Sequence, residues 1–335
     1  MTSTTTTTAT AQFNPDRYQR MHYRRCGRSG LMLPAFSIGG WHNFTDRDNV
    51  VEMMTAAFDL GITHVDLANN YGPPPGEAET QVGDVLRREF KGHRDELIIS
   101  SKAGYRMWPG PYGDLGSKKS LIASLDQSLQ RLGLEYVDIF YHHRFDPHTP
   151  LDETMGALDL IVKQGKALYV GVSNYRGPAI VEAHHQLQQR GTALTIHQPS
   201  YSMFNRTPEH DVLPHTGRLG VGVIAFSPLA QGLLSDKYLD DVPADSRAAS
   251  PTGFLQRDRI TPELQVQLHK LNDVARERGQ SLSQMALQWL LRDERVTSVL
   301  FGASRVSQIE ANVKSLDAAA FSAEELEKLD AILAE

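Results

Sequence analysis

Three ionisable side chains near the ends of apolar runs are spaced so that they could exchange a proton with a bound carbonyl group. Asp66 ends one apolar run, Tyr71 stands just beyond it before a Gly/Pro cluster, and Lys102 ends the next run. A neighbouring ammonium favours the phenolate, so we expect Lys102 to lower the pKa of Tyr71 from its usual value of about 10. Asp66 is the expected counter-ion that keeps a buried lysine charged.

His143 follows a later apolar run and adds a hydrogen-bond donor to this set. An imidazole can donate to a carbonyl oxygen and polarise it. A proton donor at a carbonyl, without a nucleophile or a metal, suits carbonyl reduction if another group supplies hydride, and a nicotinamide cofactor is the natural source. Taken alone, His143 could equally be a packed imidazole and Lys102 a solvated strand end.

Eight short apolar runs that alternate with helical patterns or long loops are the elements that must position these groups. The predicted strands are Leu33–Ile38, Ile62–Leu67, Leu97–Lys102, Val137–Tyr141, Ala167–Val172, Thr195–His197, Val221–Phe226 and Thr297–Phe301. Helices are predicted over Lys118–Leu132, Asp152–Lys163, Pro178–Gln189 and Val306–Leu316, and from Ser322 onward. Alternating strands and helices favour a parallel sheet, and eight such units predict an α/β fold, a (β/α)8 TIM barrel. Residues His22–Leu33 predict an N-terminal β-hairpin.

Polar or aromatic residues end nearly every predicted strand. In chain order these are Trp41, Asp66, Lys102, His143, Ser173 with Asn174, Gln198, and Phe226 with Ser227. Catalytic groups of such barrels come from the C-terminal ends of the strands, so we expect these side chains on one rim. The irregular stretch Asp236–Asp258 follows the seventh strand and is expected to overhang the same rim, as long functional loops do.

Composition describes an ordinary globular chain of 335 residues, with 40% hydrophobic and 22% charged residues. The Thr-rich start predicts a disordered tail over residues 1–20, which leaves 21–335 as a single domain. A net charge of -6 gives no reason to expect a nucleic-acid partner, and no apolar run approaches the roughly 20 residues of a membrane span. The single cysteine, Cys26, fits a reducing cytoplasm and excludes an intrachain disulfide framework.

Several segments together carry a family resemblance. They are DLANNYG (66–72), SKAG (101–104), YVDIFYHHR (136–144), GKALYVGVSNY (165–175), IHQPSY (196–201), AFSPLAQGLLSDKY (225–238) and GASRVSQIEANV (302–313). From about Tyr23 to Leu333 the chain resembles the aldo-keto reductases. It is most similar to the branch of bacterial L-glyceraldehyde 3-phosphate reductases and potassium-channel β subunits.

The resemblance implies a catalytic tetrad of Asp66, Tyr71, Lys102 and His143, with Tyr71 as the general acid. The histidine of the tetrad falls on His143 rather than His142, because His143 directly precedes Arg144. In the channel subunits an asparagine stands at this position, so the histidine favours a working reductase.

The resemblance also implies NADPH/NADP bound across the barrel mouth without a Rossmann domain. The implied cofactor-binding residues are Trp41, Asp66, Ser173, Asn174, Gln198, Phe226, Ser227, Pro228, Leu229, Ala230, Gln231, Lys237, Arg247, Gly302, Ser304, Gln308 and Asn312. Ser173, Asn174 and Gln198 would hold the carboxamide, Lys237 would follow the pyrophosphate, and Ser304 with Arg305 would receive the 2′-phosphate. Two positions depart from the family pattern, because Ala311 replaces an acid and Gly302 replaces a lysine found in many relatives.

For the substrate, the resemblance implies a small aldehyde such as glyceraldehyde 3-phosphate or methylglyoxal. The pocket would be lined by Trp41, Tyr71, Trp108 and His143, and the chain would form a homo-oligomer, a tetramer or octamer. One alternative is a nucleotide-sensing regulatory subunit of the channel-β type with little turnover. Another is a metal-dependent barrel hydrolase, although the adjacent His142 and His143 should point to opposite faces of a strand.

Overall fold

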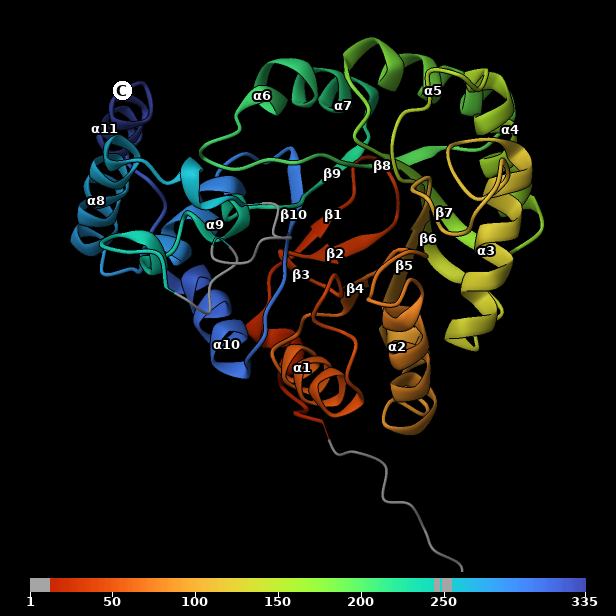
Figure 1. Cartoon of the computed structure of the whole chain (residues 1–335), viewed down its shortest axis with the longest axis horizontal. Helices are drawn as coiled ribbons and strands as arrows, with labels where there is room; N and C mark the ends of the chain where they lie inside the picture. The colour runs from red at the N-terminus through yellow and green to blue at the C-terminus, as the bar shows by residue number, and fades with distance from the viewer. Residues whose placement is uncertain (1–12, 244–247, 249–254) are drawn as a thin grey trace, which may run out of the picture.

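Eight parallel strands form a closed barrel at the centre of the molecule (Figure 1). The structure, a computed structural model, describes residues 13–243, 248 and 255–335. The barrel strands are β3 (Phe36–Gly39), β4 (His64–Asp66), β5 (Ile98–Ala103), β6 (Val137–His142), β7 (Ala167–Ser173), β8 (Leu194–Gln198), β9 (Gly222–Ala225) and β10 (Val296–Phe301). They follow one another around the barrel in chain order, and β10 closes it by pairing with β3. The predicted TIM barrel is therefore confirmed.

Helices surround the barrel and bury its outer face (Figure 1). They are α1 (Arg47–Asp59), α2 (Glu77–Arg88), α3 (Lys118–Leu132), α4 (Leu151–Lys163), α5 (Gly177–Gln189), α6 (Thr207–Asp211), α7 (Leu213–Leu219), α8 (Pro262–Glu277), α9 (Leu282–Leu291), α10 (Val306–Lys314) and α11 (Ala323–Leu333). The predicted elements omit α2, α6, α7 and α8. For α2 a signal was present, because its buried positions Ala78, Val82, Val85 and Leu86 have helical spacing. None of the described helices combines the length and the apolar character needed to cross a membrane.

The predicted N-terminal hairpin covers the end of the barrel at which the strands begin. Strands β1 (Tyr23–Arg25) and β2 (Met32–Pro34) pair antiparallel. At their turn Gly27 has a φ of +56°, and a Cβ there would lie 2.1 Å from the carbonyl oxygen of Gly220. Only glycine fits this close approach without strain. The hairpin therefore closes the bottom of the barrel and leaves the C-terminal rim as the open end.

The predicted boundary between a tail and the domain, at residue 21, does not agree with the packing of residues 13–20. Residues 1–12 lie outside the described part of the chain, whereas Phe13 is buried and its ring lies 4.8 Å from those of Phe58 and Phe90. The short helix Arg17–Arg20 follows, and Arg17 forms an ion pair with Glu96. Burial of an aromatic ring stabilises this segment, so the packed domain begins at Phe13 rather than at residue 21.

Three fully buried imidazoles should make the fold sensitive to mild acid. Burial lowers the pKa values of His64, His142 and His197 to about 4 each. Below about pH 6.5 the unfolded chain binds protons that the folded chain excludes, so stability is lost as the pH falls from there toward 4. We expect each imidazole to remove about 2 kcal/mol of unfolding free energy between about pH 7 and pH 5. Urea unfolding at the two pH values measures the loss, and an unchanged midpoint would contradict it.

Candidate active site

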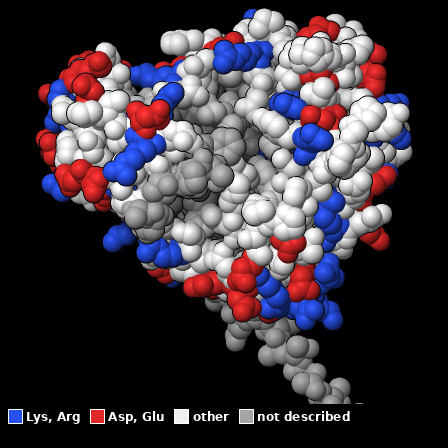
Figure 2. Space-filling view, in the orientation of Figure 1, with Lys and Arg blue, Asp and Glu red and all other residues white. Residues whose placement is uncertain are grey.

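A cavity of about 590 Å³ opens at the C-terminal ends of the strands. The face shown in Figure 2 is hollowed near its middle, and charged side chains lie mainly around the margin. The predicted site residues that line the cavity are Trp41, Asp66, Tyr71, His143, Gln198, Phe226, Ser227, Pro228, Leu229, Gln231, Lys237, Gly302, Ser304, Gln308 and Asn312. Residues from strand ends far apart in sequence thus meet around one space.

The remaining predicted site residues do not line this cavity. Lys102 is fully buried and contacts Asp66. Ser173 Oγ donates to the carbonyl oxygen of Gln198 at 2.8 Å, and Asn174 Nδ2 donates to that of His143 at 3.1 Å, so both side chains tie neighbouring strand ends together. Trp108 and Ala230 also fall outside the lining. Arg247 lies outside the described residues.

A buried ion pair is built from two adjacent strands at the base of the cavity. Asp66 of β4 is in register with Ser100 of β5, and Lys102 follows two residues later on the same face. The Lys102 ammonium pairs with Asp66 Oδ2 and also donates to the carbonyl oxygen of Leu67 at 2.6 Å. Asp66 Oδ1 accepts from Ser100 Oγ at 2.6 Å and from Gln198 Nε2 at 3.3 Å. Both charges are therefore compensated, as burial requires.

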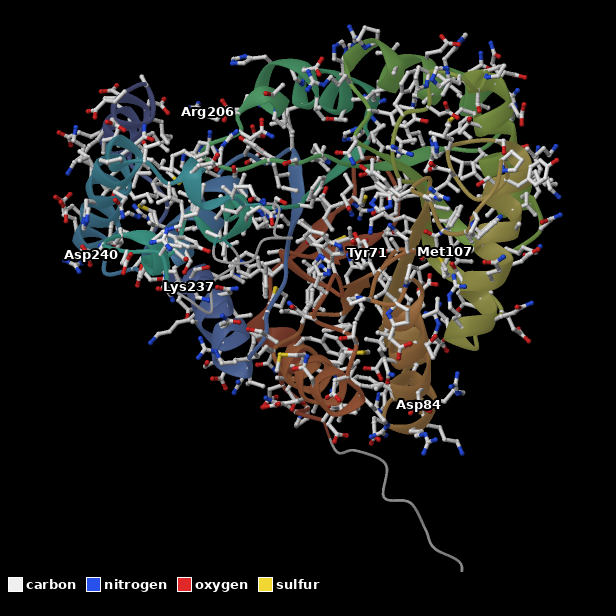
Figure 3. The ribbon with its side chains drawn as sticks, in the orientation of Figure 1. Tyr71, Asp84, Met107, Arg206, Lys237 and Asp240 are labelled. Carbon is white, nitrogen blue, oxygen red and sulfur yellow. The ribbon has the colours of Figure 1, made fainter. Side chains whose placement is uncertain are left out.

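Tyr71 stands above this pair on the loop that follows β4. Figure 3 shows it near the middle of the ring of strands, with Lys237 toward α10. Its ring centroid lies 5.2 Å from Lys102 Nζ and 6.0 Å from that of His143. Burial raises the pKa of Tyr71 well above its usual value, and Asp66 and Tyr105 raise it further. The expected net fall of the Tyr71 pKa below its usual value is wrong, because the loss of solvent outweighs any effect of the Lys102 charge. Tyr71 is consequently a neutral phenol near pH 7.

His143 is a neutral imidazole beside Tyr71. Burial lowers its pKa well below the usual value, and the nearby charges of Lys102 and Arg144 lower it further. Its Nδ1 atom is buried and has no hydrogen-bond partner among the described residues. His142 instead directs Nδ1 to the hydroxyl of Tyr175 at 2.6 Å and does not line the cavity. Strand β6 ends at His142, so His143 is the first residue after the strand, and of the two only His143 lines the cavity.

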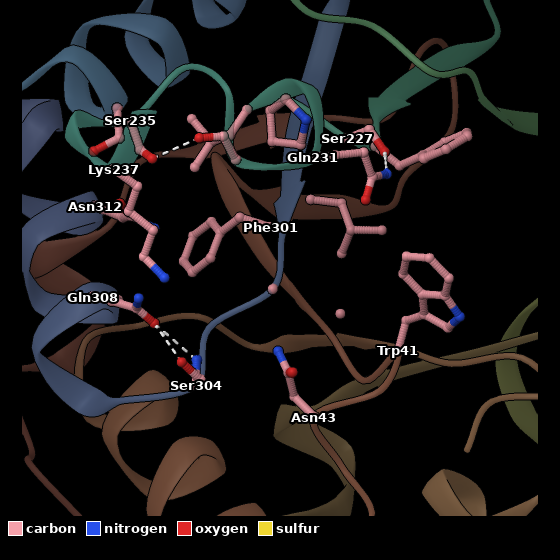
Figure 4. Close-up of a pocket in the computed structure, with 18 of the residues that line it drawn as sticks. Trp41, Asn43, Ser227, Gln231, Ser235, Lys237, Phe301, Ser304, Gln308 and Asn312 are labelled. Atoms are coloured by element: carbon pink, nitrogen blue, oxygen red, sulfur yellow. Dashed lines mark hydrogen bonds between the residues drawn. The ribbon is translucent and has the colours of Figure 1, made fainter. Parts of the chain in front are cut away.

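The other end of the cavity is made by the loop after β9 and by the start of α10. Ser227, Ala230 and Gln231 have backbone φ values of 54°, 48° and 62°, which residues other than glycine rarely adopt. Backbone strain of this kind is concentrated at binding sites. At the start of α10, Gln308 accepts from the backbone amide and the hydroxyl of Ser304 at 2.8 and 3.2 Å. Figure 4 shows Trp41 at the opposite end of the cavity from these two residues.

Several lining residues are absent from the predicted set. Asn43 lines the cavity and donates to the carbonyl oxygen of Ala303 at 3.0 Å. Phe301 ends β10 and satisfies the same strand-end rule that identified the other sites. Ser281 and Ser283 line the cavity from the start of α9, where Ser281 and Gln284 form a capping box. The Ser-x-x-Gln pattern was available in the sequence as a helix-start signal, but only the fold brings α9 to this cavity.

The chain matches the family model for the "Aldo/keto reductase family" over residues 32–334. It is 55% identical to the L-glyceraldehyde 3-phosphate reductase of Escherichia coli O157:H7, over 96% of this chain and 95% of that protein. The reductase of the same name from strain K12 is 54% identical over the same shares. A putative voltage-gated potassium channel subunit beta of Schizosaccharomyces pombe is 35% identical, over 97% of this chain and 96% of that protein. Among the described residues, no group of three His, Cys, Asp or Glu side chains is placed to hold a metal ion.

Proposed function

The chain belongs to the aldo/keto reductase family, and from that premise and the geometry of the cavity we propose that it reduces small aldehydes to alcohols with NADPH. The observation that carries the proposal is the convergence of Tyr71 and His143 above the buried pair of Asp66 and Lys102. A proton donor, a hydrogen-bond donor and a charge that stabilises the deprotonated donor are thus in one place.

The residues around the cavity fit an extended nicotinamide nucleotide. A volume of about 590 Å³ lies within the range of ligand sites. Trp41 and Phe226 offer aromatic surface near the reactive centre, and Ser304 stands where α10 begins. No side chain caps that helix start, and a helix N-terminus favours a phosphate. When bound, a reduced nicotinamide supplies hydride to the carbonyl carbon.

The chain's own residues manage the proton in this proposal. Tyr71 is neutral, so it can deliver its phenolic proton to the carbonyl oxygen as negative charge develops there. Lys102 lies 5.2 Å from the Tyr71 ring and stabilises the phenolate that remains. His143 is neutral as well and orients the carbonyl oxygen through a hydrogen bond. Solvent then returns a proton to Tyr71.

Glyceraldehyde 3-phosphate is the substrate that we propose first, because two relatives at 54–55% identity are reductases named for it. Methylglyoxal is the second candidate. The test is oxidation of NADPH by the purified chain with each aldehyde, repeated with NADH. Turnover with a small aldehyde and a preference for NADPH support the proposal. Tight NADPH binding without turnover on any aldehyde would favour the regulatory alternative that the similarity to a channel subunit raises.

Substitutions of two cationic side chains should distinguish binding of the pyrophosphate from recognition of the 2′-phosphate. Lys237 lines the cavity, and Arg305 is the N-cap residue of α10. If Lys237 contacts the pyrophosphate, Lys237→Met raises KM for NADPH and for NADH alike, by about 10-fold. If Arg305 contacts the 2′-phosphate, Arg305→Ala raises KM for NADPH alone, by a similar factor. Initial rates at varied cofactor concentration measure both effects.

Lys314 provides the matched control for these variants. It is exposed and lies in the last turn of the same helix, so Lys314→Ala removes an equal charge far from the helix start. An equal rise of KM for NADPH in the Lys314 variant would mean that overall charge, and not a phosphate contact, is responsible.

A further inference from the structure

The interior of the barrel holds an apolar cluster and, beside it, a group of buried polar side chains. Side chains of alternate strand residues point inward, and the interior positions of β6, β8 and β9 carry Ile139, Tyr141, Ile196 and Ile224. Next to Leu300, which belongs to the apolar cluster, strands β10, β3, β4 and β5 carry a group of fully buried polar side chains: Ser298, Ser37, His64, Ser100, Asp66 and Lys102. Bulky aliphatic side chains usually fill such barrels. A group of six buried polar side chains therefore calls for a specific reason.

Four of these side chains form a continuous chain of hydrogen bonds that ends on Asp66. We call Ser298, Ser37, His64 and Ser100 the interior chain. Ser298 Oγ lies 2.7 Å from Ser37 Oγ, and Ser37 Oγ lies 2.9 Å from His64 Nδ1. On the other side of the imidazole, Nε2 lies 2.9 Å from Ser100 Oγ, which donates to Asp66 Oδ1 at 2.6 Å. None of the four lines the cavity.

The direction of each hydrogen bond follows from the number of protons available. A hydroxyl has one proton, and Ser100 gives its proton to Asp66, so His64 Nε2 must donate to Ser100. Burial keeps His64 neutral by lowering its pKa to about 4, and a neutral imidazole has only one N–H. Its Nδ1 must therefore accept from Ser37, which in turn accepts from Ser298. Every proton in the interior chain points toward Asp66.

We propose that His64 is a positioning residue for the catalytic centre, acting through Ser100 on Asp66. The opposite tautomer of His64 would draw the Ser100 proton to Nε2 and leave Asp66 Oδ1 with Gln198 at 3.3 Å as its remaining donor. The protonated Nε2 excludes that arrangement. Asp66 is thereby fixed, and with it the Lys102 ammonium beneath Tyr71. This inference rests on the proposed function, because Lys102 matters only if Tyr71 transfers a proton.

The interior chain should affect kcat and not substrate binding. Ser100→Ala and His64→Leu are expected to lower kcat for aldehyde reduction by roughly 10-fold to 100-fold, the size of effect that follows when a residue supporting a metal ligand is lost. KM for the aldehyde should stay near the wild-type value, since neither side chain lines the cavity. His64→Gln keeps a donor and an acceptor on one terminal group and should recover part of the lost kcat.

His197→Leu is the matched control. His197 is equally buried, has a pKa lowered to about 4 by that burial, and donates one hydrogen bond from Nε2 to the carbonyl oxygen of Tyr175 at 3.0 Å. It has no link to Asp66 among the hydrogen bonds of the described residues. Both leucine variants should lower the thermal midpoint, but only His64→Leu should lower kcat. Equal kcat losses in the two variants would overturn the inference.

An NMR measurement on the wild-type chain tests the inference without reference to turnover. The ¹⁵N shifts of His64 should identify a protonated Nε2 and an unprotonated Nδ1 near neutral pH. The other tautomer, or an imidazolium, would overturn the inference even if aldehydes are reduced. A chain that has the expected tautomer but reduces no aldehyde would instead contradict the proposed function, so the two failures are distinguishable. Full kcat in Ser100→Ala, with wild-type turnover present, would also overturn the inference.

Discussion

Replacing Tyr71 with phenylalanine should lower kcat for aldehyde reduction by about a thousandfold, within the range that a positioned general acid contributes. The change removes one oxygen from a ring that lines the cavity, 6.0 Å from the ring of His143. Phenylalanine keeps the shape of that ring, so NADPH binding should persist and can be followed by the quenching of protein fluorescence. Turnover measured as NADPH oxidation at saturating aldehyde gives the effect on kcat.

Tyr105 supplies the control for this substitution. Its ring lies 4.6 Å from that of His143, yet it is exposed, and it lies 4.5 Å from the Arg144 guanidinium instead of above the buried pair of Asp66 and Lys102. Tyr105→Phe should therefore retain most of the wild-type kcat. A Tyr71→Phe enzyme as active as the Tyr105→Phe enzyme would remove Tyr71 from the role of acid.

The raised pKa of Tyr71 also fixes the sign of the pH dependence. Reduction uses the neutral phenol, which is present at all pH values below that pKa, so its rate should not fall between about pH 7 and pH 9 through this group. Alcohol oxidation uses the phenolate, which is scarce in this range and becomes about tenfold more abundant with each pH unit. The kcat for alcohol oxidation should rise with pH in the wild type, and this rise should vanish in Tyr71→Phe.

The second large effect, on stability, is expected when the acidic partner of the buried ion pair, Asp66, is replaced. Asp66→Asn leaves the Lys102 ammonium with the carbonyl oxygen of Leu67 and no neutralising charge. Such a change should reduce the free energy of unfolding by about 3–5 kcal/mol. Lys102→Met should cost less, because Asp66 would still accept from Ser100 and Gln198. Urea unfolding of the two variants measures the difference, and a larger loss in Lys102→Met would contradict it.

The double variant Asp66→Asn/Lys102→Met separates stability from catalysis. It contains no unpaired charge, so much of the stability lost in Asp66→Asn should return. Its kcat should remain low, since no ammonium lies beneath Tyr71 to stabilise the phenolate. Recovery of both stability and kcat would mean that the ion pair serves the fold alone.

The sequence was informative about elements and strand ends because both depend on local patterns. Strands buried on two faces appear as short apolar runs, and the expected runs Leu97–Lys102 and Val137–Tyr141 correspond to β5 and β6 within one residue at each end. The strand-end rule placed Asp66, His143 and Gln198 around one cavity. Helix α2 was missed even though its buried face has helical spacing. The pattern that predicts this helix is therefore present in the sequence and was overlooked.

Interactions that join distant segments could not be read in this way. Glu79 of α2 is fully buried because Arg131 of α3 donates to it at 2.7 Å and Ser101 of β5 donates to it at 2.5 Å. Ser173 and Asn174 end a strand as expected, but their side chains bind to neighbouring strand ends instead of lining the cavity. The partner of a polar side chain depends on how neighbouring strands are placed beside one another. That register is set by the fold and is not visible in the linear sequence.

The residue types alone determined that an acid, a phenol, an amine and an imidazole would meet at the open end of a barrel, because the C-terminal ends of parallel strands share one rim. The tertiary structure decided how those groups ionise. Burial raises the pKa of Tyr71 where its neighbour Lys102 was expected to lower it. The tertiary structure also links His64 to Asp66 through Ser100. Both outcomes arise from the removal of water by side chains distant in sequence, and no local pattern contains that information.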